Sequence, residues 1–214
     1  MDLSTICQEI SYIANDTTLA SGGANYSRCK AWVRESYYLD ILATRNDWWF
    51  LRKTETVDTV ASTNRISLPS GVDIKEVREI RILGYKPIEG ISESQADELG
   101  GYTDITEEGR PTKFWHYDRS SGVDRLQLYP VPDSVYTLQI RCMATPDTLT
   151  DDSDTPSLPD EFHYLLVKGG YCKALKHNQD PGYQQEFAEY LGSIKRLQNR
   201  NARDDYRTDS WWRV

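Results

Sequence analysis

The sequence lacks long hydrophobic runs. Its longest apolar bursts, such as residues 48–51, cover a few positions and are bounded by charged residues, whereas a membrane-spanning helix needs about 20 apolar residues. The opening MDLSTICQEI carries Asp2 and Glu9 where a secretory signal would carry lysines followed by an apolar core. We therefore expect a chain with no export signal and no membrane span.

Cysteine and histidine are scarce, and their spacing indicates no metal or nucleophile site. No C-x-x-C pair occurs, so we expect free thiols in a reducing compartment. No histidine stands in H-E-x-x-H or in a Cys–His ligand spacing, and we interpret the histidines as surface or partly satisfied residues. The residues concerned are Cys7, Cys29, Cys142, Cys172, His116, His163 and His177.

The signatures of common enzymes are absent as well. The chain contains no G-x-S-x-G elbow, P-loop or G-x-G-x-x-G loop. Residues 151–154, DDSD, resemble part of a calcium loop but lack its glycine and its closing glutamate. The 33 acidic residues offer many carboxylate pairs for glycoside hydrolysis, but nothing in the sequence selects one pair. We predict no catalytic, cofactor-binding or metal-binding residue and no enzymatic activity.

Charge is unevenly distributed along the chain. The 33 acidic and 25 basic residues give a net charge of −8, which argues against wrapping of duplex DNA, because that binding needs a cationic face. In contrast, residues 195–214 hold six basic and three acidic side chains. This stretch is either a solvated helix face or a basic tail that meets an acidic partner or lines a passage for DNA.

Hydrophobic periodicity predicts four helices. Pro159 followed by two acidic residues favours the start of the third helix, and Gly169 with Gly170 allows close approach of a neighbouring element. Apolar residues recur at the spacing of a buried helical face within residues 3–13, 26–45, 159–177 and 181–205. The second helix is expected to bury Tyr26, Cys29, Val33, Tyr37 and Ile41.

Short alternating runs separated by turn residues predict strands between these helices, within residues 52–148. The clearest is residues 135–143, in which polar and apolar residues alternate. Residues 88–110 hold seven acidic residues and one basic residue, and predict a long exposed excursion with a short helix at residues 92–99. The other predicted strands cover residues 54–60, 65–68, 77–83, 113–117 and 125–129.

A cluster of large aromatic residues separates the second helix from the strands. Trp48, Trp49 and Phe50 follow one another at this junction. Side chains of this size bury much apolar surface while keeping a polar tip. We interpret the cluster as a hydrophobic hinge core between two lobes, with a platform on which a ligand stacks as the alternative.

The C-terminal stretch loses its amphipathic pattern. From residue 198 onward the sequence is polar on every side and cannot pack against its own core. Its last four residues, however, are WWRV, and two tryptophans are costly to leave in water. We predict a tail that docks into a partner, with folding back onto its own surface as the alternative. The predicted portion that contacts the partner includes Arg203, Tyr206, Arg207, Trp211, Trp212 and Arg213.

These elements together predict an α+β fold. It consists of a helical bundle of two N-terminal and two C-terminal helices, with an inserted antiparallel β-rich lobe and an extended C-terminal tail. We assign residues 1–51 to the N-terminal helices of the bundle, 52–150 to the inserted lobe, 151–205 to the C-terminal helices and 206–214 to the docking tail.

Five segments stand out along the chain: DWWFL at residues 47–51, ISLP at 66–69, LQLYPVPD at 126–133, YTL at 136–138 and LPDEF at 158–162. Together with the amphipathic opening helices and the polar C-terminal tail, they cover nearly the whole chain. In this arrangement the sequence resembles the head-to-tail adaptor, or connector, proteins of tailed bacteriophages, which include the tail-tubular adaptors of short-tailed phages.

The resemblance implies a structural protein of the virion, located at the head–tail junction and assembled in the host cytoplasm. The bundles would stand side by side in a ring of roughly twelve copies, beneath the portal protein, with the C-terminal tail reaching along the portal. The β-rich lobe would present a platform for the next tail component, a nozzle or tail tube. The ring would extend the DNA channel and help retain the genome, which passes without sequence-specific binding. No cofactor and no membrane are implied.

Two other functions stay open at this point. One is a carbohydrate-active protein associated with the tail, which would degrade a polysaccharide and lose that activity when one carboxylate is replaced. The other is a neck or tail completion protein that does not contact the portal. The first predicts turnover of a sugar polymer, and the second predicts no portal binding.

Overall fold

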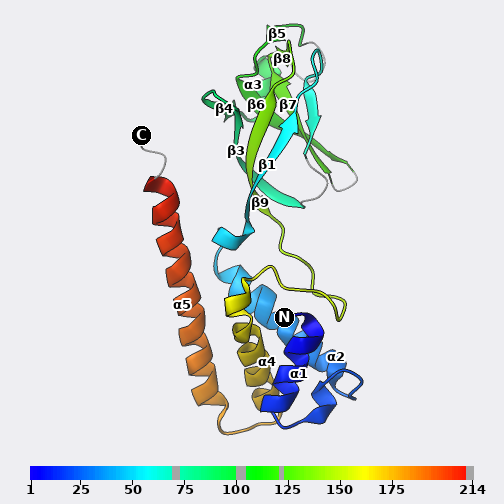
Figure 1. The fold of residues 1–214 in the computed structure, drawn as a ribbon, viewed down its shortest axis with the longest axis vertical. Coiled ribbons are helices and arrows are strands. Elements are labelled where there is room, and N and C mark those ends of the chain that lie inside the picture. The colour runs from blue at the N-terminus through cyan, green and yellow to red at the C-terminus, as the bar shows by residue number, and fades with distance from the viewer. Residues whose placement is uncertain (69–72, 100–104, 121–122, 211–214) are drawn as a thin grey trace. The chain divides into compact units, whose positions relative to one another are not determined.

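The computed structural model describes residues 1–68, 73–99, 105–120 and 123–210 (Figure 1). For residues 118–120, 123–124 and 203–210 it describes the backbone alone. The chain divides into two compact units. Unit 1 contains Met1–Leu51 and Pro146–Val214, and unit 2 contains Arg52–Thr145, so unit 2 is inserted between the two segments of unit 1.

Unit 1 is helical, and its main helices lie where the periodicity predicts them. They are α1 (Leu3–Ile13), α2 (Tyr26–Glu35), α4 (Tyr164–His177) and α5 (Tyr183–Ser210). A 3-10 turn, η5 (Asp160–Phe162), follows Pro159 and leads into α4, and another, η1 (Thr17–Leu19), lies in the loop after α1. Because α4 contacts α1, α2 and α5, it is the central helix of the unit. The predicted pairs of N-terminal and C-terminal helices are confirmed.

The second helix contains an irregularity that its sequence pattern does not predict. After α2 the chain continues as a π-helical turn, η2 (Ser36–Ile41), and a 3-10 turn, η3 (Leu42–Thr44). A π turn holds more residues than an α turn, and Leu39 within it is 63% exposed. The predicted core residues of this helix are all buried: Tyr26, Cys29, Val33, Tyr37 and Ile41.

Two glycines set how closely α4 packs against its neighbours. A Cβ atom at Gly169 would lie 2.5 Å from Ser36 Oγ and 2.7 Å from the Tyr190 hydroxyl. A Cβ atom at Gly170 would overlap the side chain of Ile10. Since contacts this short do not occur between real side chains, the predicted close approach at these two positions is confirmed.

Unit 2 is a curled seven-stranded sheet with the strand order β1-β9-β3-β4-β6-β7-β2 (Figure 1). In β9 the side chains of Leu138, Ile140 and Cys142 are buried on one face, which confirms the predicted alternation, and all six predicted strands are present. The strands of the sheet are β1 (Arg52–Asp58), β2 (Arg65–Ser67), β3 (Ile74–Ile82), β4 (Pro87–Gly90), β6 (Lys113–Ser120), β7 (Val123–Tyr129) and β9 (Thr137–Ala144).

The sheet is mixed, and the prediction of an antiparallel lobe is wrong in this respect. β4 pairs in parallel with β6, with Glu89 opposite Lys113, while the other neighbouring strands of the sheet are antiparallel. β4 is short, begins with proline and ends with glycine, so its place beside β6 comes from tertiary contacts rather than from a local pattern. A second parallel pair, β5 (Glu108–Gly109) with β8 (Val131–Pro132), also has no sequence signal.

The short helix predicted inside the acidic excursion is confirmed. α3 (Glu93–Glu98) begins after Ser92, whose hydroxyl accepts a hydrogen bond from the Gln95 amide. The Gln95 side chain in turn accepts a hydrogen bond from the Ser92 amide, and this reciprocal capping box fixes the start of the helix. Residues 100–104 of the predicted excursion lie outside the described residues.

The last helix is longer than predicted. The backbone of α5 is helical to Ser210, past the expected end at residue 205, so residues 206–210 of the predicted tail belong to this helix. A helix satisfies its own backbone hydrogen bonds, and the loss of an apolar face therefore does not end it. The rest of the predicted tail, including Trp211, Trp212 and Arg213, lies outside the described residues.

The four cysteines are free, as predicted, and each is buried. Burial raises the pKa of the Cys172 thiol to about 11 and also raises the pKa of Cys142. Because the thiolate is the reactive form of cysteine, these thiols are poorly reactive in the folded chain.

We predict that His163 makes the stability of unit 1 depend on pH. The ring is buried and donates from Nε2 to the Leu158 carbonyl at 2.7 Å, and burial lowers the His163 pKa below its ordinary value of 6.5. The unfolded chain then binds a proton that the folded chain does not, so the free energy of unfolding falls as the pH drops below 6.5. Urea denaturation at pH 7.5 and 5.5 should show this loss, with a smaller loss in His163→Gln. An unchanged loss in that variant would contradict the assignment, and exposed His116→Gln is the control.

We also predict opposite effects for the same substitution in two helices. Gly169→Ala should lower the free energy of unfolding by about 1–3 kcal/mol, because the new methyl group overlaps Ser36 and Tyr190. Gly192→Ala, in α5, should raise it by about 0.5–1 kcal/mol, because nothing lies within 4 Å of its Cβ position and alanine favours the helix. Urea denaturation of both variants measures the pair, and equal effects at both positions would contradict the packing described here.

Candidate interaction surfaces

α5 buries one face against the rest of unit 1, and among the residues whose side chains are described this face includes Asn201. The buried apolar residues of the face include Tyr190, Ile194 and Leu197, which recur at helical spacing. Asn201 is fully buried. Its side-chain oxygen accepts a hydrogen bond from the Trp49 amide at 2.8 Å, and its side-chain nitrogen donates to the Asp47 carbonyl at 2.9 Å. Asn201 therefore ties α5 to the chain segment that follows the second helix.

The predicted aromatic cluster packs inside unit 1, around the 3-10 turn η4 (Trp49–Leu51). Trp48 is buried, and its ring centroid lies 5.4 Å from that of Phe50 and 6.2 Å from that of Trp49. The Trp49 ring packs edge-to-face against Phe162, with the centroids 6.0 Å apart. Trp48, Trp49 and Phe50 thus have a packing role in unit 1, while a hinge role for them stays a prediction.

A cation and two carboxylates fasten α4 to its neighbours. The Lys173 Nζ atom lies 2.8 Å from Asp40 Oδ2 and 3.2 Å from Glu35 Oε1. The Tyr190 hydroxyl donates to Asp40 at 3.3 Å, and burial raises the pKa of Tyr190, which keeps this hydroxyl protonated. The network joins α2, η2, α4 and α5 by charge-assisted hydrogen bonds, which are stronger than neutral ones.

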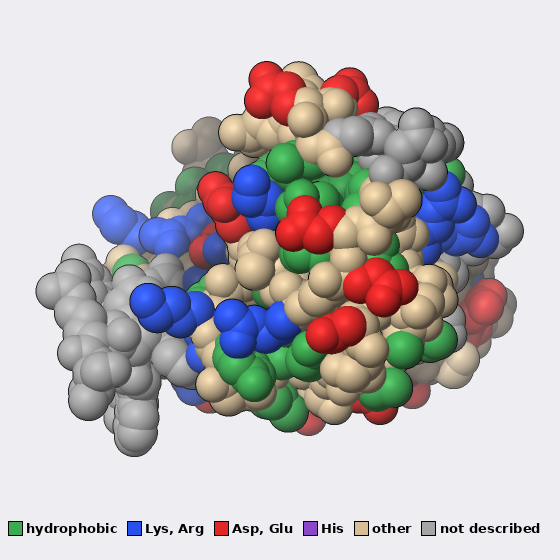
Figure 2. All heavy atoms as spheres, turned by 90° about the horizontal axis from the view of Figure 1, so that it is seen from above, with side chains coloured by type: hydrophobic (Ala, Val, Ile, Leu, Met, Phe, Trp, Pro, Cys, Tyr) green, Lys and Arg blue, Asp and Glu red, His purple; other side chains and the backbone are tan. Residues whose placement is uncertain are grey.

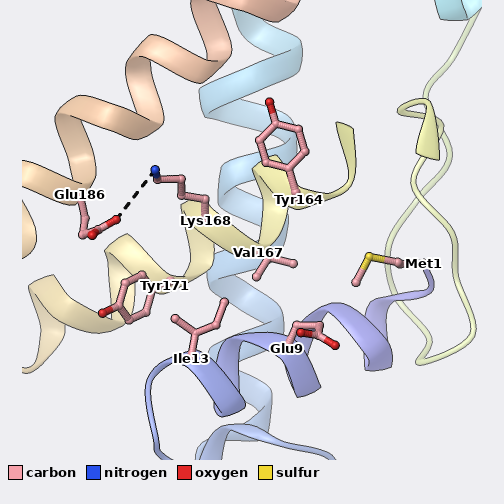
Figure 3. Close-up of a pocket in the computed structure, with 8 residues that line it drawn as sticks. All are labelled: Met1, Glu9, Ile13, Tyr164, Val167, Lys168, Tyr171 and Glu186. Atoms are coloured by element: carbon pink, nitrogen blue, oxygen red, sulfur yellow. Dashed lines mark ion pairs between the residues drawn. The ribbon is translucent and has the colours of Figure 1, made fainter. Parts of the chain in front are cut away.

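An apolar groove of about 620 Å³ opens between α1 and α4 (Figure 3). Its apolar lining comes from Met1, Ile13, Tyr164, Val167 and Tyr171. On the side toward α5, Lys168 and Glu186 form an ion pair at 3.9 Å. Ile13 is 50% exposed and Tyr164 is 45% exposed, so unit 1 leaves an apolar surface uncovered at this place.

Unit 2 has a second uncovered apolar surface, at one end of its sheet. β1 ends opposite the start of β9, where Asp58 pairs with Thr137, and the Leu83 amide donates to the Thr137 carbonyl just after β3. This end lies opposite the end at which the chain enters and leaves the unit. Figure 2 shows the molecule from above, and on this face Asp and Glu side chains, in red, lie among hydrophobic side chains, in green. The exposed hydrophobic residues at these strand ends are Val60, Leu83, Tyr85 and Val135, and we call them the sheet-end patch.

Within the part of the chain that the structure describes, no three His, Cys, Asp or Glu side chains gather to hold a metal ion. Among the same residues, no helix combines the length and the hydrophobicity that a membrane crossing needs.

Residues 1–210 match the family described as SU10 adaptor protein. The chain belongs to this family. It is a family of phage adaptor proteins, and the resemblance inferred from the sequence is confirmed. Membership points to a structural protein that binds other phage components. No curated protein matches the chain.

The residues predicted to dock the adaptor onto a partner are only partly described. Arg203, Tyr206 and Arg207 lie on α5, where the backbone alone is described, and Trp211, Trp212 and Arg213 lie outside the described residues. Their docking role stays a prediction. The prediction that the chain from residue 198 onward cannot pack against its own core is wrong at Asn201, which is buried and bonded within unit 1. Its position four residues after Leu197, on the buried face, was the available signal.

We predict that Asn201→Ala loosens α5 in the adaptor. The substitution leaves the Trp49 amide and the Asp47 carbonyl without these two side-chain hydrogen bonds, and it should lower the free energy of unfolding by about 1–3 kcal/mol. Hydrogen exchange of the amides at the C-terminal part of α5 should become faster. The matched control is Asn199→Ala, an exposed position in the same helix; equal effects of the two substitutions would refute the anchoring role.

Proposed function

We propose that this adaptor forms a closed ring of roughly twelve copies beneath the phage portal. The ring extends the DNA channel, helps retain the packaged genome and provides the attachment site for the next tail component, a nozzle or tail tube. The observation that carries this proposal is the match of residues 1–210 to the adaptor family. A net charge of −8 supports passage of DNA without tight binding, because like charges repel.

Two surfaces of the chain suit two different neighbours. In unit 1, α5 continues beyond Asn201 to Ser210, and the sequence of residues 203–214 holds three arginines and two tryptophans. Trp and Arg are enriched among the residues that dominate binding energy at interfaces. We assign this extension, residues 203–214, to the portal.

The sheet-end patch of unit 2 is the proposed platform for the next tail component. Its members are between 51% and 65% exposed, and they gather at adjoining strand ends. A cluster of exposed apolar residues marks an interaction site more often than single, scattered apolar residues do. The partner surface would therefore carry an apolar contact at its centre.

Deletion of residues 206–214 tests the role of the tail. The truncated adaptor should keep the fold of both units, because the deletion leaves in place the buried contacts described for α5, from Tyr190 to Asn201, but it should lose binding to the portal in a pull-down. The milder double substitution Trp211→Ala and Trp212→Ala should weaken binding by at least about tenfold. Normal portal binding by the truncated adaptor would contradict the assignment, and an unchanged melting temperature shows that folding is intact.

Electron microscopy of the full-length adaptor mixed with its portal tests the ring. The expected result is a ring of adaptor copies with a central hole on one face of the portal. A neck or tail completion protein that does not contact the portal would leave the portal bare, and this outcome would overturn the proposal. The mixture is the informative sample, because ring assembly is proposed to take place on the portal.

A further inference from the structure

The groove between α1 and α4 is uncovered in the single chain, and the residues that line it restrict which partner would fit. Tyr12 and Ile13, at the end of α1, are 82% and 50% exposed. Glu9, one turn earlier on the same helix, lines the groove, and among the described residues it has no ion-pair partner. A partner that fits therefore brings an apolar side chain together with a cation.

α5 carries such a combination on its outer surface. Leu191 is 48% exposed, although it is a large aliphatic residue. Lys195, exposed one turn later, makes no ion pair within the described part of the chain. Residues four apart are neighbours on a helix surface, so Leu191 and Lys195 form one small feature. We call these two residues, with the exposed Ala188 one turn before them, the α5 ridge.

The ridge of one copy cannot reach the groove of the same copy. Glu186 lines the groove, and Leu191 follows it by five residues, which turns the side chain by roughly 140° around the helix axis. The buried face, with Tyr190 and Ile194, lies between these two directions. α4 packs between the two helices, since it contacts both α5 and α1. The groove and the α5 ridge therefore face different sides of unit 1.

We infer that the α5 ridge of one adaptor copy docks into the α1–α4 groove of the next copy. Leu191 fills part of the apolar groove, and Lys195 pairs with Glu9. A contact between two different surfaces of the same chain is heterologous, and it generates a ring when the rotation between copies closes. This inference rests on the proposed ring and names the surfaces that build it. A groove of about 620 Å³ has room for several side chains of the ridge.

Thiol cross-linking of the assembled ring tests the contact. The four natural cysteines are buried, so a thiol reagent should react mainly with the cysteines introduced by Ile13→Cys and Leu191→Cys. The double variant, mixed with the portal and treated with a short bismaleimide, should give a ladder of linked adaptor copies up to the full ring. Each single variant alone should give no adaptor–adaptor link, and an equal mixture of the two single variants should give linked dimers only.

The controls separate this inference from the ring itself. Leu39→Cys, another exposed hydrophobic position of unit 1, should give no link when combined with Leu191→Cys. Rings that form on the portal without the link between positions 13 and 191 would overturn the named contact and leave the ring standing. Links between two copies of the Ile13→Cys variant, or from its new thiol to the portal, would overturn it too. The absence of any ring with the unmodified adaptor would overturn both proposals.

Charge reversal gives an independent measurement. Glu9→Lys and Lys195→Glu should each reduce the fraction of complete rings on the portal, with about fivefold weaker association between copies. The double variant, in which the charges are exchanged, should recover most of this loss, and the difference should shrink at high salt. Independent, additive losses in the double variant would show that the two residues do not meet.

Discussion

The arrangement of unit 1 depends on the absence of side chains at Gly169 and Gly170. Without Cβ atoms at these positions, α4 comes close enough to Ile10 of α1, Ser36 of η2 and Tyr190 of α5 to touch all three. That closeness places Lys173 within reach of Asp40 and Glu35. Both the apolar packing around α4 and the ion pairs of Lys173 thus depend on the two glycines in this central helix.

The same central position explains why unit 1 has surfaces left over. α4 contacts α1, α2 and α5, but no other described element of unit 1 fills the groove between α1 and α4. This groove is open to solvent (Figure 3), and Leu191 on the outer surface of α5 is exposed. In a single copy these surfaces leave apolar area in contact with water, which is unfavourable, and burial against a partner would remove that cost.

Local patterns in the sequence account for much of the fold. Residues close together in the sequence determine three features: the buried face of the second helix from Tyr26 to Ile41, the alternation in β9, and the start of α3 at Ser92. The parallel pairing of β4 and the π turn at residues 36–41 do not, because both depend on elements distant in the sequence. The groove could not be predicted either, since Ile13 and Tyr164 come together only in the folded bundle. The predicted end of α5 was wrong because an amphipathic pattern reports burial rather than helicity.

Unit 2 begins and ends on paired strands. Arg52, the first residue of β1, lies opposite Met143 in β9, roughly 5 Å away, so the chain enters and leaves unit 2 on neighbouring strands. A segment whose ends meet in this way can be lengthened, shortened or exchanged with little demand on the chain on either side. The sheet of the adaptor can therefore vary in size and surface while the geometry of the helical unit stays the same.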